Sequence, residues 1–222
     1  MPSYRVKEIY ATLQGEGAQT GHAAVFLRFA GCNLWSGREQ DRSTAACQFC
    51  DTDFVGTDGP NGGAFPDVDA LADKVAEVWS EPLAGNDQDT QRLVVCTGGE
   101  PLLQLDAPAI DALHARGFRV AVETNGTRPL PEAGRTGGID WLTVSPKAGA
   151  TLAVTSGDEL KLVYPQPTLM PESVADLNFR HFFLQPMDGP NQAEHIQAAA
   201  AYCRSHPRWR LSLQTHKLIG LD

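Results

Sequence analysis

Hydrophobic residues recur along the chain in two alternating patterns. Short continuous apolar runs, each followed by glycine, proline or polar residues, are typical of buried strands in a parallel sheet. Such runs lie at 92–100, 118–126, 141–147, 159–164, 181–189 and 209–217. Apolar residues at helical spacing occupy 67–80, 106–117 and 191–207. The sequence therefore predicts an α/β fold with a parallel sheet and right-handed crossovers.

Local signals fix some of the boundaries. The helix at 106–117 begins with Asp106 as a capping residue, carries Pro108 in its first turn and ends at Gly117. Residues 56–67, GTDGPNGGAFPD, are dense in glycine and proline and predict an exposed connection. Too little chain precedes this segment to form a separate core, so we expect one domain over residues 1–222.

Polar residues gather where four of the predicted strands end. They occupy 97–100, 123–125, 145–147 and 185–188. The carboxyl ends of parallel strands meet at one edge of a sheet, which is where βα folds place their sites. The sequence therefore predicts a single site assembled across this edge.

Charge and hydropathy exclude several classes of function. The formal net charge of −9 disfavours nonspecific nucleic-acid binding, which needs a basic face, so we expect no direct nucleic-acid partner. No apolar run is long enough to span a membrane, and MPSYRVKEIY lacks the apolar stretch of a signal peptide. We therefore expect a cytoplasmic protein without membrane contact. Its cysteines would stay reduced, which favours metal binding or catalysis over disulfides.

Three of the five cysteines, Cys32, Cys47 and Cys50, lie within residues 29–54. A structural zinc ion needs four ligands, and the fourth would come from elsewhere, such as His22 or Cys96. Cys96 lies in the apolar run LVVC, which is more typical of a buried core residue, and Cys203 in an alanine-rich helix is interpreted in the same way. Three thiolates can also hold a [4Fe–4S] cluster with one iron left open to another ligand.

The residues around the cysteines favour the cluster. Phe49 places an aromatic ring between Cys47 and Cys50, and TGGEP at 97–101 ends the next strand. Its two glycines allow the backbone to approach a ligand closely. Glu100 can accept hydrogen bonds from an ammonium group.

A Cys-aromatic-Cys ending followed by Gly-Gly-Glu at the next strand end resembles the radical S-adenosylmethionine (SAM) superfamily. That superfamily usually spaces its cysteines CxxxCxxC, whereas fourteen residues separate the first two here. Such an insert occurs in some 7-carboxy-7-deazaguanine synthases of queuosine biosynthesis. Segments resembling that branch follow in the family's order over nearly the whole chain: ATLQGEGAQTGHAAVFLRFAGCNLW, CDTDF, VVCTGGEPLLQ, VETNGT, VSPK, ELKLV, FLQPMDG and LQTHKLIG.

The resemblance implies a truncated parallel βα barrel of the radical SAM type, with a cluster-loop insert at 33–46. Cys32, Cys47 and Cys50 would hold a [4Fe–4S] cluster, and SAM would chelate the open iron. An electron from flavodoxin or ferredoxin would cleave SAM, and the resulting radical would abstract hydrogen from 6-carboxy-5,6,7,8-tetrahydropterin. Ring contraction and loss of ammonia would then give 7-carboxy-7-deazaguanine, with SAM regenerated.

The resemblance also assigns the SAM contacts. The Gly-Gly-Glu segment would hold the methionine amino group, and Ser-Pro-Lys would line methionine and ribose. Gln-Pro-Met-Asp would frame the adenine together with an aromatic ring. The implied cofactor residues are Phe49, Cys50, Asp51, Gly99, Glu100, Ser145, Pro146, Lys147, Gln185, Pro186, Met187 and Asp188.

The implied pterin site lies beside the SAM site. A guanidinium suits a carboxylate through two parallel hydrogen bonds, and a carboxylate suits the guanidine-like pterin edge. These roles fall to Arg28 and Glu16. Contacts at residues 13–15 would be largely through the backbone. The substrate set is Leu13, Gln14, Gly15, Glu16, Arg28, Thr97, His216 and Asp222, the last through the chain end.

Two further expectations come from the resemblance. Thr52 would bind Mg²⁺ next to the cluster, because this ion prefers hard oxygen ligands, with Asp51 and Asp53 as acidic supports. A homodimer is also expected. Two alternatives stay open: a glycyl-radical-type activase, and a non-catalytic binding module stabilised by zinc or a cluster.

Overall fold

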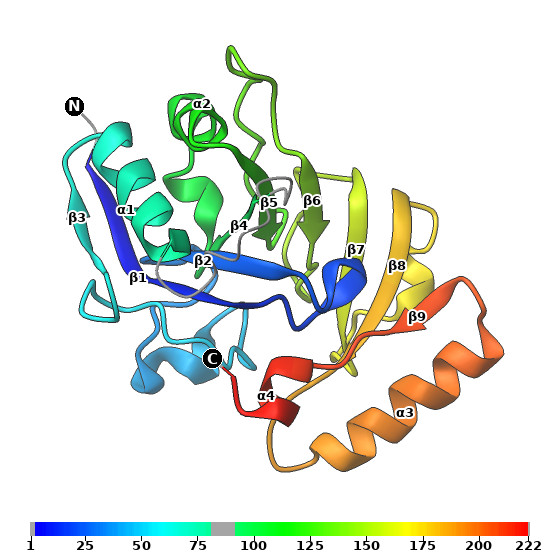
Figure 1. Cartoon of the computed structure of the whole chain (residues 1–222). Coiled ribbons are helices and arrows are strands. Elements are labelled where there is room, and N and C mark those ends of the chain that lie inside the picture. The colour runs from blue at the N-terminus through cyan, green and yellow to red at the C-terminus, as the bar shows by residue number, and fades with distance from the viewer. Residues whose placement is uncertain (1–2, 81–91, 222) are drawn as a thin grey trace.

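The nine strands found in the described residues belong to one sheet (Figure 1). The structure, a computed structural model, describes residues 3–80 and 92–221. The strand order is β3-β1-β2-β4-β5-β6-β7-β8-β9, with β3 and β9 at the two ends. The strands are β1 (Tyr4–Leu13), β2 (Ala23–Phe29), β3 (Gly63–Phe65), β4 (Arg92–Gly98), β5 (Phe118–Thr124), β6 (Trp141–Val144), β7 (Ser156–Tyr164), β8 (Asn178–Pro186) and β9 (Trp209–Leu211).

Strand directions confirm the parallel sheet from β2 onward and correct the expectation elsewhere. The pairs from β2–β4 to β8–β9 are parallel, whereas β1 pairs antiparallel with both β2 and β3. The loop expected at 56–67 contains β3. The strand expected at 209–217 ends at Leu211, because Ser212 and Thr215 instead bond the loop that follows β1.

Helices cover one face of the sheet. They are α1 (Val68–Ser80), α2 (Ala107–Ala115) and α3 (Gln192–Ser205), whereas the short α4 (Thr215–Ile219) is bound to the loop after β1, where the Thr215 amide donates to the Gly15 carbonyl. The 3₁₀ turns are η1 (Gly17–Gln19), η2 (Glu39–Thr44), η3 (Pro101–Leu103) and η4 (Pro171–Val174). Asp106 caps α2 by accepting a hydrogen bond from the Ala109 amide, as predicted. No α-helix lies between β5 and β8, and only loops and the turn η4 connect the successive strands there.

The helices define which strand residues form the core. In β4, Val94 and Cys96 belong to the main core cluster with α1 and α2, while Leu93 and Val95 belong to a small cluster on the opposite face. Fully burying a side chain such as Leu or Phe contributes roughly 1.5–3 kcal/mol, so the helix-covered face carries most of the stabilisation. The opposite, inner face can therefore hold polar residues.

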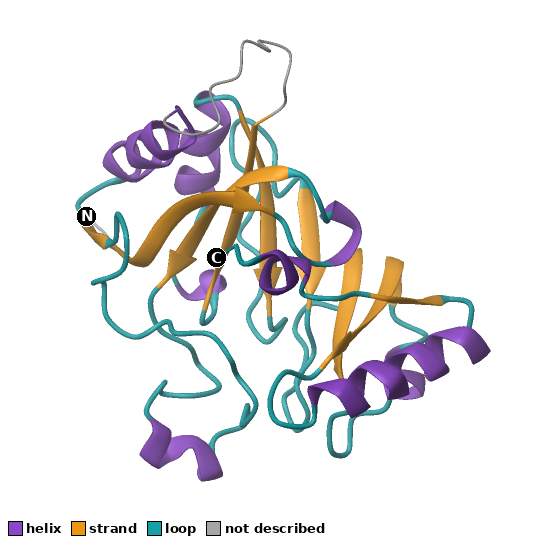
Figure 2. Cartoon of the chain, turned by 60° about the horizontal axis from the view of Figure 1, so that its bottom comes forward, coloured by secondary structure: helices purple, strands orange, loops and turns teal. Residues whose placement is uncertain are grey.

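The segment after β2 leaves the sheet. Figure 2 shows the chain containing η2 as an excursion that stands away from the strands. Its ends return to the sheet edge, where the Gly31 amide donates to the Phe54 carbonyl at 3.0 Å. In the described residues, no helix is both long and apolar enough to cross a bilayer.

Candidate active site

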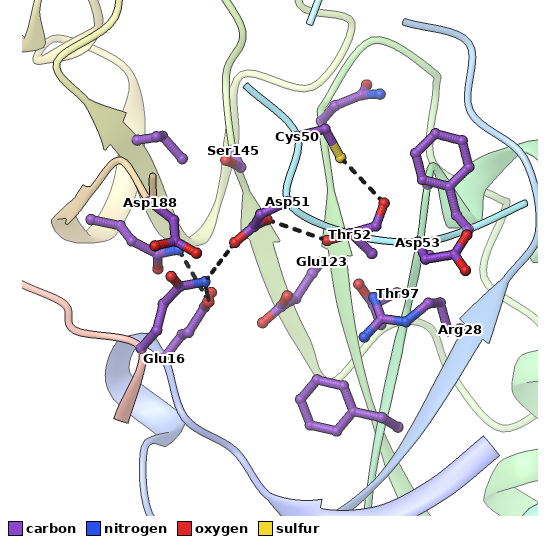
Figure 3. A pocket seen from close by; sticks show the side chains of 18 of the residues that line it. Glu16, Arg28, Cys50, Asp51, Thr52, Asp53, Thr97, Glu123, Ser145 and Asp188 are labelled. Atoms are coloured by element: carbon purple, nitrogen blue, oxygen red, sulfur yellow. Dashed lines mark hydrogen bonds between the residues drawn. The ribbon is translucent and has the colours of Figure 1, made fainter. Parts of the chain in front are cut away.

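A cavity of about 540 Å³ opens at the carboxyl ends of the parallel strands. Figure 3 shows Arg28 and Thr97 on one side of it in this view, Glu16 and Asp188 on the other, and Thr52 between them. Most residues implied by the resemblance line this cavity: Leu13, Gln14, Glu16, Arg28, Cys32, Cys47, Phe49, Cys50, Asp51, Thr52, Thr97, Gly99, Ser145, Lys147, Gln185, Pro186, Asp188 and His216.

Four implied residues lie behind the cavity wall, and a fifth, Asp222, lies outside the described residues. The Gly15 carbonyl accepts hydrogen bonds from the Thr215 amide and hydroxyl, both at 2.9 Å. The Pro146 carbonyl accepts a hydrogen bond from the Gln166 side chain. The Met187 amide donates to the Tyr164 carbonyl, and the Met187 carbonyl bonds the His195 ring. Each of these residues supports a lining neighbour.

Glu100 is the fourth of these residues and is fully buried. Its carboxylate accepts hydrogen bonds from the Thr124 hydroxyl at 2.7 Å, the Asn125 amide at 2.8 Å and the Leu102 amide at 3.0 Å. Burial raises its pKa despite these bonds. The carboxylate thus ties the end of β4 to the end of β5 and is not among the residues that line the cavity. Its contact with the methionine amino group stays a prediction.

The glycines before Glu100 allow the cysteine segment to approach β4 closely. A Cβ atom on Gly99 would lie 2.3 Å from the Gly31 carbonyl oxygen and 2.7 Å from the Cys32 Cβ atom. The Glu100 amide also donates to the Gly31 carbonyl at 3.0 Å. The Gly-Gly pair is therefore a steric requirement of the contact that places Cys32 at the cavity.

The three cavity cysteines are free thiols, as predicted. Burial raises the pKa of the Cys32 and Cys47 thiols, and the Lys147 ammonium opposes this shift at Cys47. Lys147 donates to the Ser145 carbonyl at 2.8 Å and hydroxyl at 2.7 Å. The cation would stabilise thiolates, the form in which cysteine binds metal. Three thiols in one cavity beside a half-buried cation fit a cluster held by three thiolates.

The candidates for a fourth zinc ligand lie elsewhere. Cys96 is fully buried in the main core, and burial raises its pKa to about 12, which confirms it as a core residue. Cys203 packs against the same core from α3. His22 is exposed, and its ring bonds the Gln19 carbonyl at 2.9 Å. Within residues 3–80 and 92–221, no three His, Cys, Asp or Glu side chains surround a single ion position.

A buried lysine organises the opposite wall. Lys161 on β7 forms ion pairs with Glu16 and, at 3.3 Å, with Glu123 on β5. Burial acts to lower the pKa of Lys161, but the surrounding carboxylates outweigh it and raise that pKa. Burial acts to raise the pKa of Glu16, but Lys161 outweighs it and holds that pKa below its usual range. The pair is therefore ionised.

Amide side chains complete this wall. Gln185 and Gln214 donate to the Glu16 carboxylate at 3.1 and 3.0 Å. Gln14 donates to Glu123 at 3.0 Å. Glu16 is therefore oriented by partners from β7, β8 and the segment before α4, and its oxygens face the cavity at a fixed position.

Arg28 stands across the cavity from this network. Its Nε donates to Glu8 at 2.8 Å and one terminal nitrogen donates to the Tyr10 hydroxyl at 3.0 Å. The side chain is only 15% exposed and lines the cavity. A guanidinium fixed on its β1 side can present its remaining edge to an anionic ligand.

Helix α4 is bound to the segment that follows the cavity cysteines. Lys217 of α4 pairs with Asp51 at 2.7 Å and with Asp188 at 2.6 Å. Gln214 also donates to Asp51 at 3.2 Å. Asp51 therefore faces α4, while the Thr52 hydroxyl lies 3.5 Å from its carboxylate. Asp53 pairs with Lys7 at 2.8 Å.

The sequence interpretation missed several lining residues, above all Glu123, Lys161, Gln214 and Lys217. A signal existed for Lys161, because it and Glu159 alternate with leucines in ELKLV, and alternation places them on the opposite strand face from the core. Glu123 was grouped with the polar strand ends but not assigned to the site. Gln214 and Lys217 carried no comparable signal, since they follow a strand that ends early.

The open βα sheet and its strand-end cavity define an incomplete βα barrel. The sequence is 62% identical to 7-carboxy-7-deazaguanine synthase of Caulobacter vibrioides and 61% identical to that of Bordetella pertussis, over 99% of both chains in each comparison. The crystal structure of QueE from Escherichia coli aligns with a TM-score of 0.61 at 27% identity, covering 95% of this chain and 93% of that one. No family model matches the sequence.

The chain belongs to the 7-carboxy-7-deazaguanine synthase family. This membership confirms the predicted family and decides against a glycyl-radical-type activase. The structural likeness confirms the predicted truncated parallel βα barrel.

Proposed function

We propose that this chain converts 6-carboxy-5,6,7,8-tetrahydropterin to 7-carboxy-7-deazaguanine with loss of ammonia, as a radical SAM carbon–nitrogen lyase in queuosine biosynthesis. The observation that carries this proposal is the composition of one cavity. Three free thiols line one side, and other parts of the lining hold a fixed arginine, Arg28, and an ionised carboxylate, Glu16. These are the groups needed for a three-thiolate cluster and for a substrate with a carboxylate and a guanidine-like edge.

Cys32, Cys47 and Cys50 would hold the [4Fe–4S] cluster, and the ends of β4, β6 and β8 would hold SAM. When bound, these groups supply hydrogen-atom abstraction chemistry, while the protein binds and orients the reactants. Lys147 would balance negative charge on the thiolates. Its Nζ atom lies 6.0 Å from the centre of the Phe49 ring, between Cys47 and Cys50 in the chain. Gly99 keeps β4 close enough to the cysteine segment for both groups to share one cavity.

The substrate would be bound between Arg28 and Glu16. The guanidinium pairs with the substrate carboxylate, and Glu16 accepts hydrogen bonds from the pterin edge. Lys161 keeps Glu16 ionised, so that it accepts rather than donates. Glu123, which shares the same lysine, offers a second acceptor on this wall.

The remaining parts of the proposal extend this site. Thr52 would contact Mg²⁺ beside the cluster, supported by its position in the cavity lining. Flavodoxin or ferredoxin would supply the electron. We also propose a homodimer in the cytoplasm, where the thiols would stay reduced.

The test is turnover by the full chain, purified and reconstituted without oxygen. With the tetrahydropterin, SAM and a strong reductant, we expect 7-carboxy-7-deazaguanine and released ammonia, with about four irons bound per chain. A reaction without SAM is the matched control. If four irons are bound but no product forms, the proposed reaction is overturned. A colourless protein holding one zinc ion would support the non-catalytic module instead.

The chain end has its own test. We hypothesise that the terminal carboxylate of Asp222 contacts the substrate, because α4 is fixed to the cavity wall through Lys217. Deleting Leu221 and Asp222 should raise the KM for the tetrahydropterin. An unchanged KM would exclude this contact.

A further inference from the structure

Arg42, in the insert between Cys32 and Cys47, contacts the turn that carries the other two cluster cysteines. One terminal guanidinium nitrogen donates to the Gln48 carbonyl at 3.0 Å and to the Cys50 carbonyl at 3.1 Å. Both carbonyls belong to the Cys47–Cys50 turn. A single cationic side chain thus binds this turn at two backbone positions.

The insert also fixes the guanidinium itself. Its carbon lies 4.0 Å from the centre of the Trp35 ring, in the geometry of a cation–π contact. Its Nε donates to both carboxylate oxygens of Glu39, at 2.8 and 3.0 Å. Arg42 is therefore held by a ring on one face and by a carboxylate at its edge.

Trp35 connects this arrangement to the interior. The indole is 8% exposed, donates to the Arg38 carbonyl at 3.2 Å, and packs edge-on against Phe54 with ring centres 5.6 Å apart. Phe54 is 1% exposed, and its carbonyl accepts the hydrogen bond from Gly31 that joins the two ends of the cysteine segment, residues 29–54. The Leu34 carbonyl accepts hydrogen bonds from the amides of Ala46 and Cys47. The insert is thus a folded unit that brings Cys47 back toward Cys32.

We propose that Arg42 is a positioning residue for the cluster: it holds the Cys47–Cys50 turn in its cluster-binding conformation and places a positive charge beside it. The inference rests on the proposed function, in which these cysteines bind the cluster. Loss of a residue that orients metal ligands typically weakens metal binding 10–100-fold. A cation near the cluster also favours its reduced, more negative state, because opposite charges attract.

Substituting Arg42 by lysine or by glutamine separates the effect of the guanidinium's shape from the effect of its positive charge. Lysine keeps the charge but lacks the planar fork that stacks on Trp35 while bonding two carbonyls. Glutamine lacks the charge and most of the reach. Arg38 provides the control, because it lies in the same insert, is exposed and contacts this turn through none of the bonds described above.

The experiment uses the full chain as wild type, Arg42→Gln, Arg42→Lys and Arg38→Gln, each reconstituted without oxygen. Iron release to a ferrous chelator and the midpoint potential of the cluster are measured, with the melting temperature of the iron-free protein as a check on folding. We expect Arg42→Gln to release iron about tenfold faster or more and to shift the midpoint potential to more negative values. Arg42→Lys should release iron at an intermediate rate with a potential near wild type, and Arg38→Gln should match wild type.

If Arg42→Gln releases iron at the wild-type rate and keeps the wild-type midpoint potential, the proposal is overturned. An equal effect of Arg38→Gln would also overturn it. If Arg42→Gln does not fold, Arg42→Lys decides: iron release at the wild-type rate then overturns the positioning role. A wild-type chain that binds iron but makes no product contradicts the proposed reaction and leaves the Arg42 measurements valid. A wild-type chain that takes up no cluster overturns both proposals.

Discussion

The two walls of the cavity are built in opposite ways. The cysteine wall comes from one continuous stretch, residues 29–54, held by backbone hydrogen bonds and by the stack of Arg42 on Trp35. The opposite wall is collected from the loop after β1, from β5, β7 and β8, and from the segment before α4, and is held by the ion pairs of Lys161. One wall is a loop with local contacts, and the other is part of the sheet.

This difference separates two kinds of sensitivity. A loop outside the sheet contributes little to the core, so changes within it should alter cofactor binding more than folding. The sheet wall buries charges that depend on one another. Removing one of them leaves another unpaired in the interior, which costs stability as well as function. Four predictions test this contrast, from the largest expected effect to the smallest.

Cys47→Ala should abolish cluster binding and product formation, since two thiolates replace three. The melting temperature of the iron-free protein should stay close to wild type, because Cys47 is part of the loop wall. Iron analysis and calorimetry measure the two effects. Cys203→Ala, a cysteine on α3 away from the cavity, should keep its iron. A Cys47→Ala chain with a full complement of iron would contradict the three-thiolate site.

Lys161→Met should lower the free energy of unfolding by about 1–3 kcal/mol, because it leaves the partly buried carboxylates of Glu16 and Glu123 without their cation. Chemical denaturation of the iron-free protein measures this loss. The double variant Lys161→Met with Glu16→Gln should recover part of it by removing one unpaired charge. Equal stability of wild type and Lys161→Met would show that the sheet wall does not depend on its ion pairs.

Arg28→Lys should raise the KM for the tetrahydropterin at least tenfold, since a hydrogen bond to a charged group is worth roughly 1.5–3 kcal/mol. Lysine keeps the charge but cannot form two parallel bonds to a carboxylate. Steady-state kinetics measure the change, and kcat should fall less than KM rises. Arg5→Lys, on the exposed side of β1, is the control. A KM within twofold of wild type would argue against Arg28 as the carboxylate partner.

Glu159→Gln should become more stable relative to wild type as pH rises. Glu159 is 2% exposed, and burial raises its pKa above the ordinary 4.5. Above pH 4.5 the folded chain therefore binds more protons than the unfolded chain at this residue, so wild-type stability falls with rising pH until the folded carboxyl ionises. Denaturation midpoints from below pH 4.5 to neutrality measure the difference. Glu132→Gln, at an exposed position, is the matched control variant. A stability difference for Glu159→Gln that stays constant with pH would refute the prediction.

The sequence predicted more of the cysteine wall than of the sheet wall. Cysteine spacing, the aromatic residue between Cys47 and Cys50 and the following glycines are local features that survive as a pattern in the chain. The Arg42 contacts were not predicted, because the path of the insert decides which backbone carbonyls its guanidinium reaches. The hydrogen bonds by which Glu100 joins β4 and β5 were not predicted either, because they depend on how the two strands pack side by side.

By itself, the sequence determined the strand runs, the strand-end site and the three-thiol motif, since each depends on residues close together in the chain. Only the tertiary structure decided that Lys161, Glu16 and Glu123 share one wall of the cavity. It also decided the pairing of Lys161 with Glu16, which is 145 positions away. The charges of that pair are stable in the interior because the assembled sheet brings them together, and no local pattern specifies such a contact.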